Sequence, residues 1–277
     1  MRVDLHIHTT ASDGCWTPEE VIAGVLAESI GLFAVTDHDS VAHVAITAAL
    51  LDNTGLAFLQ GTEISTMDDG VLFHILGYGI DPAHPGLSAL LAENRAKLEA
   101  TDDSDIQKLI ALGYPLVYED YLAYDYDLRR GGFKSLNYLI DQGFCTGPHD
   151  FFDNLRAKLD HQWPNFVHPT EAIAAIRAAG GAPVLAHPGA SLKHHGGVTE
   201  ATLAPLLDYG IGGLESYSQY HDAETTAFCV SWCERHGLLI TGGSDYHGGF
   251  VGRQLGAPLV DTADLQLGEL ADKIIHG

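Results

Sequence analysis

Short apolar runs alternate with amphipathic stretches along this 277-residue chain. In the first run, residues 2–8, aliphatic residues alternate with Asp4, His6 and His8. This period of two predicts a strand whose two faces meet different surroundings. Six further strands are predicted, at residues 32–36, 56–60, 71–77, 183–186, 213–217 and 238–242.

Helical stretches separate most of these strands. Thr17-Pro18-Glu19-Glu20 forms a capping box with proline at the first helical position, so a first helix is predicted there. Further helices are predicted at residues 41–51, 170–179, 200–209 and 222–236. Alternation of strand and helix predicts a parallel sheet with right-handed crossovers. Seven such strands indicate a closed or nearly closed α/β barrel of the (β/α)7 type.

The alternation breaks between residues 93 and 166, where no convincing strand is found. This stretch predicts several short helices, at residues 104–112, 133–142 and 150–159. We therefore expect a barrel domain made of residues 1–92 and 167–277. Residues 93–166 are expected to form a helical insertion between the fourth and fifth strands, lying over the barrel mouth as a lid.

Histidine, aspartate and glutamate stand where the apolar runs end. These residues are His6, His8, Asp13, His38, Glu63, His74, His187, Asp245 and His247. Barrels place functional groups at the C-terminal ends of their strands, so these side chains are expected to meet at one face. A mixture of imidazole and carboxylate suits zinc, manganese or iron. The pattern predicts one metal cluster.

The charge balance limits the class of partner. The chain has 14 basic and 37 acidic residues, a net charge of −23 with histidine neutral. Such an acidic field disfavours nucleic-acid polymers and anionic membrane surfaces. Eight of the 14 basic residues lie within residues 93–166, and residues 1–92 contain only Arg2. A cationic site for an anionic substrate must therefore come from the insertion or the C-terminal part.

The sequence also limits the compartment. No apolar run reaches the roughly 20 residues that span a bilayer. The first predicted strand begins at Arg2, which leaves no space for a signal peptide. The four cysteines form no disulfide-rich pattern. We expect a cytoplasmic protein, and the sequence does not determine its oligomeric state.

Taken in order, seven segments resemble the PHP (polymerase and histidinol phosphatase) family. They are His6-Ile7-His8, Ser12-Asp13-Gly14, Thr36-Asp37-His38-Asp39, Gly61-Thr62-Glu63, His74, Ala186-His187-Pro188 and Gly243-Ser244-Asp245-Tyr246-His247. More narrowly, the chain resembles the small stand-alone metal-dependent phosphoesterases of that family. The resemblance covers almost the whole chain. It implies a distorted (β/α)7 barrel with a helical insertion and a trinuclear site of manganese, iron or zinc.

The resemblance also implies three ligand sets. The first is His6, His8, Glu63 and Asp245; the second is Asp13, His38 and His247; the third is His74, His187 and the shared Glu63. The two residues of each i, i+2 pair, His6 with His8 and Asp245 with His247, can project toward one site from an extended strand. Asp13 stands where some relatives carry histidine, and its oxygen favours manganese or iron over zinc.

These features predict a metal-dependent phosphatase that hydrolyses a small phosphomonoester by attack of a metal-bridging hydroxide. By resemblance, the candidate substrates are histidinol phosphate, a nucleoside monophosphate and a nucleoside bisphosphate. Asp245 is the candidate acceptor of the hydroxide's proton, and His221 is a candidate donor to the leaving group. The candidate phosphate-binding cations are Arg130, Lys134, Lys158, Lys193 and Arg253.

Other functions remain open. A phosphodiesterase acting on a short or cyclic nucleotide is the nearest alternative. Amidohydrolases also begin with His-x-His, but they commonly use a carboxylated lysine on a barrel strand, and no lysine stands at a predicted strand end. A non-catalytic metal-binding module would have lost ligands, whereas every expected ligand is present. Asp37, Asp39 and Glu215 are further acidic residues near the predicted ligands, and we expect Asp37 and Asp39 to orient ligands.

Overall fold

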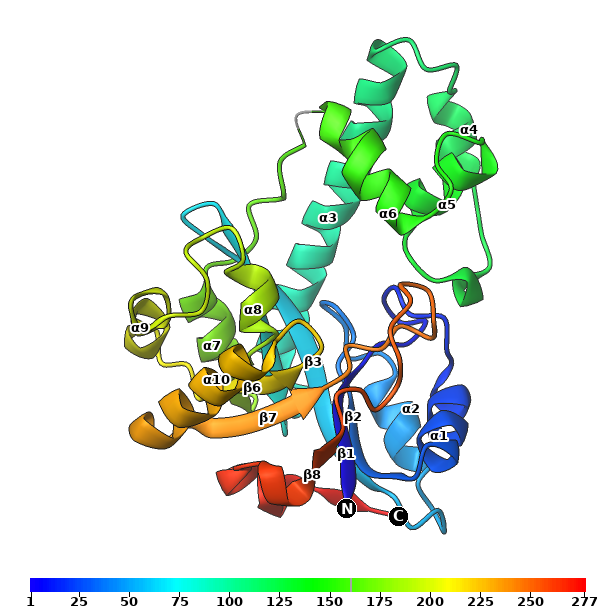
Figure 1. Ribbon diagram of the computed structural model, residues 1–277. Coiled ribbons are helices and arrows are strands. Elements are labelled where there is room, and N and C mark those ends of the chain that lie inside the picture. Colours follow the sequence, from blue (N-terminus) through cyan, green and yellow to red (C-terminus); the bar gives the residue numbers. More distant parts are fainter. Residues whose placement is uncertain (160) are drawn as a thin grey trace.

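In a computed structural model, residues 1–159 and 161–277 of the chain are described. One curved sheet has the strand order β7-β6-β5-β4-β3-β2-β1-β8, with β9 paired to β3 (Figure 1). The strands are β1 (Arg2–Ile7), β2 (Ile30–Val35), β3 (Ala57–Asp68), β4 (Val71–Tyr78), β5 (Ala182–Leu185), β6 (Gly213–Ser218), β7 (Leu239–Gly243), β8 (Val260–Asp261) and β9 (Ile275–His276).

The first and last long strands approach each other and nearly close the sheet into a barrel. The chain after β7 forms a parallel bridge between Tyr246 and Ile7 of β1. His8 N donates to Tyr246 O at 2.8 Å. A Cβ atom at Gly243 would collide with His6, so only glycine permits this close approach. The predicted distorted α/β barrel is confirmed.

The prediction that all barrel strands run parallel is wrong at β4, which is antiparallel to both β3 and β5. Asp69 and Gly70, both at positive φ, join β3 to β4 in a two-residue turn. Such turns make hairpins, whereas parallel strands need a long crossover. As a result Glu63 and His74 lie inside hairpin strands and not at strand ends. His74 pairs with Ser65, so its side chain shares a face with that of Glu63.

Helices cover the outside of the barrel. They are α1 (Pro18–Ala27), α2 (Val44–Ala49), α7 (Pro169–Ala178), α8 (Pro188–Ser191), α9 (Glu200–Asp208) and α10 (Ala223–His236). The predicted capping box is present at α1, where Thr17 N donates to Glu20 Oε2 at 3.0 Å. The buried side chains of Val21 and Val25 pack with Phe33 of β2. Each expected barrel helix is therefore present, with shifted ends.

Between β4 and β5 the chain forms a helical region, Pro85–Leu159, that rises above the barrel (Figure 1). Its elements are α3 (Pro85–Ala111), α4 (Tyr118–Ala123), η1 (Leu128–Arg130), α5 (Lys134–Asp141), α6 (Pro148–Asp150), η2 (Phe151–Leu155) and η3 (Arg156–Leu159). The 27-residue helix α3 continues through the expected domain boundary at residues 92 and 93. The helix expected at residues 104–112 is its C-terminal part. Ile106, Leu136 and Phe151 belong to a separate core within this region.

The helical region is attached to the barrel near Asp13. Gly132 N donates to Asp13 O at 2.7 Å, and Arg129 forms an ion pair with Glu20. Phe250, from the loop after β7, packs against the core of the helical region. None of the described helices combines the length and apolar composition that crossing a membrane requires.

Candidate metal centre

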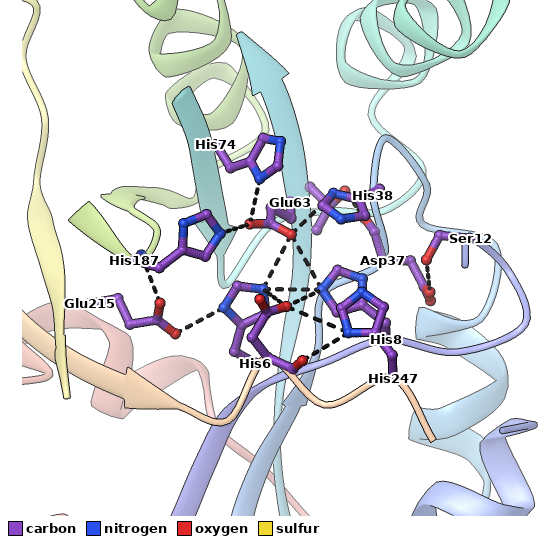
Figure 2. Close-up of polar contacts among 12 residues, drawn as sticks. His6, His8, Ser12, Asp37, His38, Glu63, His74, His187, Glu215 and His247 are labelled. Atoms are coloured by element: carbon purple, nitrogen blue, oxygen red, sulfur yellow. Dashed lines mark hydrogen bonds and ion pairs between the residues drawn. The ribbon is translucent and has the colours of Figure 1, made fainter. Parts of the chain in front are cut away.

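The structure brings the nine predicted ligands together at one end of the barrel. Figure 2 labels seven of them: His6, His8, His38, Glu63, His74, His187 and His247. β1 and the residue after it carry His6 and His8, and β3 and β4 carry Glu63 and His74. The other ligands lie in segments that follow β1, β2, β5 and β7: Asp13, His38, His187, Asp245 and His247. Strand pairing therefore gathers residues that are up to 241 positions apart, from His6 to His247.

The first ligand set is buried and compact. Donor atoms of His6, His8, Glu63 and Asp245 all lie within 4.8 Å of one another. Glu63 Oε2 is 3.2 Å from the Nε2 atoms of both histidines. Asp245 Oδ1 is 3.3 Å from His6 Nε2 and 3.1 Å from His8 Nε2. Two carboxylate oxygens and two ring nitrogens thus point at one small volume.

The remaining ligands lie on either side of the first set. Asp13 Oδ1 is 3.3 Å from His247 Nε2, and Asp13, His38, His247 and His8 form a second group within 4.8 Å. On the other side, Glu63 Oε1 is 3.0 Å from His187 Nε2 and 3.2 Å from His74 Nδ1. The two oxygens of Glu63 therefore face different groups, as a bridging ligand requires.

Several polar atoms of the predicted ligands lack protein hydrogen-bond partners, and this tests whether metals fit. Buried polar atoms almost always have a partner. In the described part of the chain, buried atoms without one include His8 Nδ1, Asp13 Oδ1, His38 Nδ1, Glu63 Oε2, His74 Nδ1, His187 Nδ1 and Asp245 Oδ1. Seven of the eleven such side-chain atoms in the described residues thus belong to predicted ligands. Imidazole and carboxylate atoms that converge with only part of their hydrogen-bonding capacity used fit divalent transition metals.

The electrostatics of the centre also suit cations. Burial alone would raise the pKa of Glu63, but His6, His38 and His74 hold it well below its usual range. His6 and His8 hold the pKa of Asp245 low in the same way, against the effect of burial. Burial lowers the pKa of His38 to about 3, which keeps its ring neutral. The carboxylates are therefore ionised and the ring of His38 is neutral, as metal binding requires. Against the effect of burial, the same carboxylates raise the pKa of His6, His8 and His74, so these rings would release a proton when a metal binds.

Buried acidic residues beside the ligands accept hydrogen bonds from the protein. Asp37 accepts from Thr9 N at 2.7 Å and from Ser12 Oγ at 2.6 Å (Figure 2). Asp39 accepts from Asn94 Nδ2 at 2.8 Å and from Ser65 N at 3.2 Å. Their oxygens are thus used to hold the loops around His38, in agreement with the expected orienting role.

Asp4 is a further buried carboxylate, which the sequence interpretation did not single out. It accepts from Ser244 Oγ at 2.6 Å and from Gly256 N at 2.8 Å, and so ties β1 to the segment that carries Asp245. Its alternation with His6 and His8 along β1 was the available signal.

A cavity of about 590 Å³ connects the metal centre with the helical region. Asp13, His38 and His74 line it on the barrel side. Aromatic side chains line the opposite side, and they are Tyr121, Tyr126, Phe133, Phe152, Trp163 and Phe166. Arg95, Lys134 and Arg156 also line it, together with the acidic residues Asp39, Glu99, Asp102 and Asp103. Arg156 is buried and forms ion pairs with Asp102 and Asp105. This size and the aromatic part of the lining suit a small molecule with a ring.

Known proteins resemble the chain over most of its length. A 3′,5′-nucleoside bisphosphate phosphatase of Chromobacterium violaceum is 32% identical over 265 residues, which cover 92% of this chain and 90% of the relative. A phosphoribosyl 1,2-cyclic phosphate 1,2-diphosphodiesterase of Eggerthella lenta is 28% identical over 90% of this chain and 95% of its own. A 5′-3′ exoribonuclease of Escherichia coli is 30% identical over 88% of this chain and 84% of its own. No protein-family model matches the chain.

Two solved structures have the same fold as this chain over nearly its whole length. A protein of Bifidobacterium adolescentis, assigned as a metal-dependent phosphoesterase, has a TM-score of 0.83 at 28% identity, covering 98% of this chain and 96% of its own. An amidohydrolase of Chromobacterium violaceum, solved with sulfate and without metal, has a TM-score of 0.81 at 28% identity, covering 100% and 98%. The chain belongs to the PHP family of metal-dependent phosphoesterases.

Membership of the PHP family makes this chain a hydrolase of phosphoric esters. The amidohydrolase alternative would call for a lysine among the metal ligands. In the described residues no lysine side chain makes a hydrogen bond or ion pair with the nine ligand side chains. The ligands themselves are all retained, which argues against a non-catalytic module.

Of the predicted phosphate-binding cations, one lies at the cavity and the others contact a protein carboxylate or the solvent. Lys134 lines the cavity. Arg130 is held by both oxygens of Asp141, at 2.7 and 2.8 Å, and Lys158 and Lys193 are exposed. The sequence interpretation did not select the cavity cations Arg95 and Arg156, and their location in the base-rich residues 93–166 was the only signal.

Arg253 contacts a predicted ligand of the PHP centre. Its Nη1 atom lies 2.5 Å from Asp245 Oδ2 and donates to Asp245 O at 2.7 Å. Tyr220 donates from its hydroxyl to the same carboxylate oxygen at 3.2 Å and is hydrogen-bonded to Arg253. The guanidinium thus binds a protein carboxylate in this structure, where the sequence predicted a substrate phosphate.

His221 has both ring nitrogens engaged with backbone. Its Nδ1 atom donates to Ser216 O at 2.9 Å, and its Nε2 atom accepts from Gly189 N at 2.9 Å. Burial lowers the pKa of His221, which fits the neutral ring that this pair of hydrogen bonds needs. Neither nitrogen is free to protonate a leaving group, so the structure opposes the predicted catalytic role of His221.

Proposed function

We propose that this protein removes a phosphate from a nucleoside bisphosphate or from a phosphomonoester of similar size. The cavity between the metal centre and the helical region is the observation that carries this proposal. Its volume of about 590 Å³ suits a nucleotide-sized ligand. The 32% identity with a nucleoside bisphosphate phosphatase supports the same substrate class.

Metal binding in this proposal uses the three ligand sets around Glu63, with manganese, iron or zinc as the ions. When bound, such ions activate water and neutralise charge on phosphate oxygens. Asp13 adds an oxygen donor to the second set, which favours manganese or iron. Asp245 Oδ1 faces the first set without a hydrogen bond and is the candidate atom for accepting a proton, although the neighbouring histidines hold the pKa of Asp245 low.

The far end of the cavity would hold the nucleoside and its second phosphate. Exposed apolar side chains gather there, among them Leu122, Phe152 and Trp163, and rings of this kind stack on a base. Arg95 and Lys134 line the cavity and form no ion pair with a carboxylate among the described residues. We therefore assign them, ahead of Arg130, Lys158 and Lys193, to the non-reacting phosphate.

The helical region would act as a lid that limits the substrate to small molecules. Relatives named as a cyclic phosphate diphosphodiesterase and as exoribonucleases keep a diester or a short RNA as the second candidate. The net charge of −23 disfavours a long polymer. All four cysteines are unpaired, which supports a reducing compartment such as the cytoplasm.

The test is phosphate release by the manganese-loaded protein across a substrate panel. The panel contains adenosine 3′,5′-bisphosphate, AMP, histidinol phosphate, a cyclic phosphodiester and a short oligoribonucleotide. We expect the bisphosphate to give the highest kcat/KM, with AMP lower because it lacks the second phosphate. Faster turnover of the diester or the oligonucleotide than of any monoester would overturn the proposal and favour the second candidate.

A further inference from the structure

Glu215 is a carboxylate inside the barrel that is neither a predicted ligand nor part of the cavity lining. It lies on β6 and has no solvent exposure. Its Oε1 atom is 2.8 Å from His6 Nδ1, and its Oε2 atom accepts from His187 N at 2.7 Å (Figure 2). Both oxygens are thus directed at residues of the metal centre, one in the first set and one in the third.

The hydrogen bond to His6 determines which ring nitrogen carries the proton. A carboxylate accepts hydrogen bonds and does not donate them, so Nδ1 of His6 is the protonated nitrogen. In the neutral ring the lone pair is then on Nε2, which faces His8 Nε2 at 3.1 Å and Glu63 Oε2 at 3.2 Å. The hydrogen bond to Glu215 therefore leaves Nε2 of His6 available as a metal ligand in the first set.

The hydrogen bond to His187 holds a backbone that is not in a favoured conformation. His187 has φ 27° and ψ 60°, in the left-handed region that non-glycine residues rarely adopt. In this conformation its side chain reaches Glu63 Oε1 with Nε2, at 3.0 Å. The N–H bond to Glu215 Oε2 therefore helps to place the imidazole of the third set.

Glu215 has no cationic side chain to balance it other than His6. No lysine or arginine among the described residues forms an ion pair with it. A buried carboxylate without a positive partner is unfavourable. Bound cations in the neighbouring sets would supply that positive charge, which links the stability of Glu215 in this position to metal binding.

We propose that Glu215 is a positioning residue that couples the first and third metal sets. Through one rigid carboxylate on β6, the orientation of His6 and the backbone of His187 are set together. The inference rests on the proposed metal centre, but it requires no particular substrate.

The test replaces Glu215 by glutamine, which has nearly the same shape. A glutamine amide has one accepting oxygen, so it cannot accept from His6 Nδ1 and His187 N at once. We expect Glu215→Gln to weaken manganese binding about 10- to 100-fold, measured as metal retained per chain against a graded chelator. Ser216→Ala is the matched control on the same strand, because its hydroxyl makes only long contacts, 3.5 Å to Leu214 O and 4.0 Å to Cys233 Sγ. It should retain metal like the wild type.

Melting temperatures distinguish positioning from a general structural role. Without metal, Glu215→Gln should melt at or above the wild-type temperature, because the variant buries one charge fewer. With manganese, it should gain less stability than the wild type. Unchanged manganese affinity would overturn the inference, and so would an equal loss of melting temperature with and without metal. These readouts involve no turnover, so a failure of the substrate proposal would leave them intact.

Discussion

The two carboxylate oxygens of Asp245 have different surroundings, because one is hydrogen-bonded by the protein and the other is not. Arg253 and Tyr220 both contact its Oδ2 atom, while Oδ1 faces the first ligand set without a protein partner. Its backbone has φ 51°, which is strained for a non-glycine residue. Arg253 also bonds the carbonyl oxygen of Asp245, so it stabilises this conformation as well as the carboxylate.

Arg253→Gln should therefore lower kcat more than it raises KM. Without the guanidinium, the carboxylate of Asp245 can rotate. This disturbs Asp245 as a predicted metal ligand but leaves the substrate contacts unchanged. We expect kcat to fall about 10- to 100-fold, with KM changed by less than about threefold. Steady-state kinetics on the best phosphomonoester measures both constants. A large rise in KM at constant kcat would instead support the phosphate-binding role that the sequence predicted.

At the residue scale, the sequence predicted which residues cluster in the barrel better than it predicted which residues line the cavity. The nine residues that the structure brings together each stand in a short local motif, such as His6-Ile7-His8 or Asp245-Tyr246-His247. No local pattern indicates which arginine of a helical region turns toward a cavity. Arg95 and Arg156 reach the cavity through the packing of α3 and η3, which depends on contacts between distant residues.

Among the elements, the β3–β4 hairpin shows what the strand pattern alone missed. An Asp-Gly dipeptide between two apolar runs is a strong hairpin signal, and Asp69-Gly70 stands at that point. The alternation of strands and helices nevertheless led to the prediction of a wholly parallel sheet. Extended apolar runs were sufficient to predict seven strands, whereas their direction required the turn chemistry.

The attachment of the helical region can be tested at Gly132. Alanine there would place a Cβ 2.7 Å from the ring of Phe250 and 2.9 Å from Leu136, beside the hydrogen bond to Asp13. We expect Gly132→Ala to raise KM several-fold and to lower the free energy of unfolding by about 1–3 kcal/mol more than the control. Gly143→Ala is that control, because it has a similar φ of 76° and open space around it. Equal effects of the two substitutions on KM and stability would contradict this account of the attachment.

A second prediction for the helical region concerns pH. Burial raises the pKa of Asp102 from 3.8 to about 7, although Arg156 lowers it. The folded protein therefore binds this proton more tightly than the unfolded chain, and the associated stability is lost as pH rises from about 4 to about 7. Urea denaturation of the manganese-loaded protein should show this loss in the wild type and not in Asp102→Asn.

A control separates this titration from charge removal in general. The hydrogen bond from Arg130 lowers the pKa of the exposed Asp141 to about 2, so Asp141 titrates below that window. Asp141→Asn should keep the wild-type dependence of unfolding free energy on pH. Identical pH profiles for Asp102→Asn and the wild type would contradict the assignment to Asp102.

In the whole molecule, the barrel and the helical region contribute different groups to the proposed reaction. The barrel supplies the buried donors, and the helical region supplies the aromatic rings and cations that face them across the cavity. The net charge is −23 and carboxylates also line the cavity, so Arg95, Lys134 and bound metal ions would have to supply the local attraction for an anionic substrate. We therefore expect the residues of the strand-end motifs to determine the reaction, and the helical region to determine which substrate is bound.

The most direct test of this account is phosphate release from adenosine 3′,5′-bisphosphate by manganese-loaded wild type and Glu63→Gln. Glu63 contacts members of all three ligand sets, so its loss should disable the whole centre. We predict rapid release by the wild type and a loss of more than about a hundredfold in the variant. Equal rates for the two proteins, or no release by the metal-loaded wild type, would contradict it.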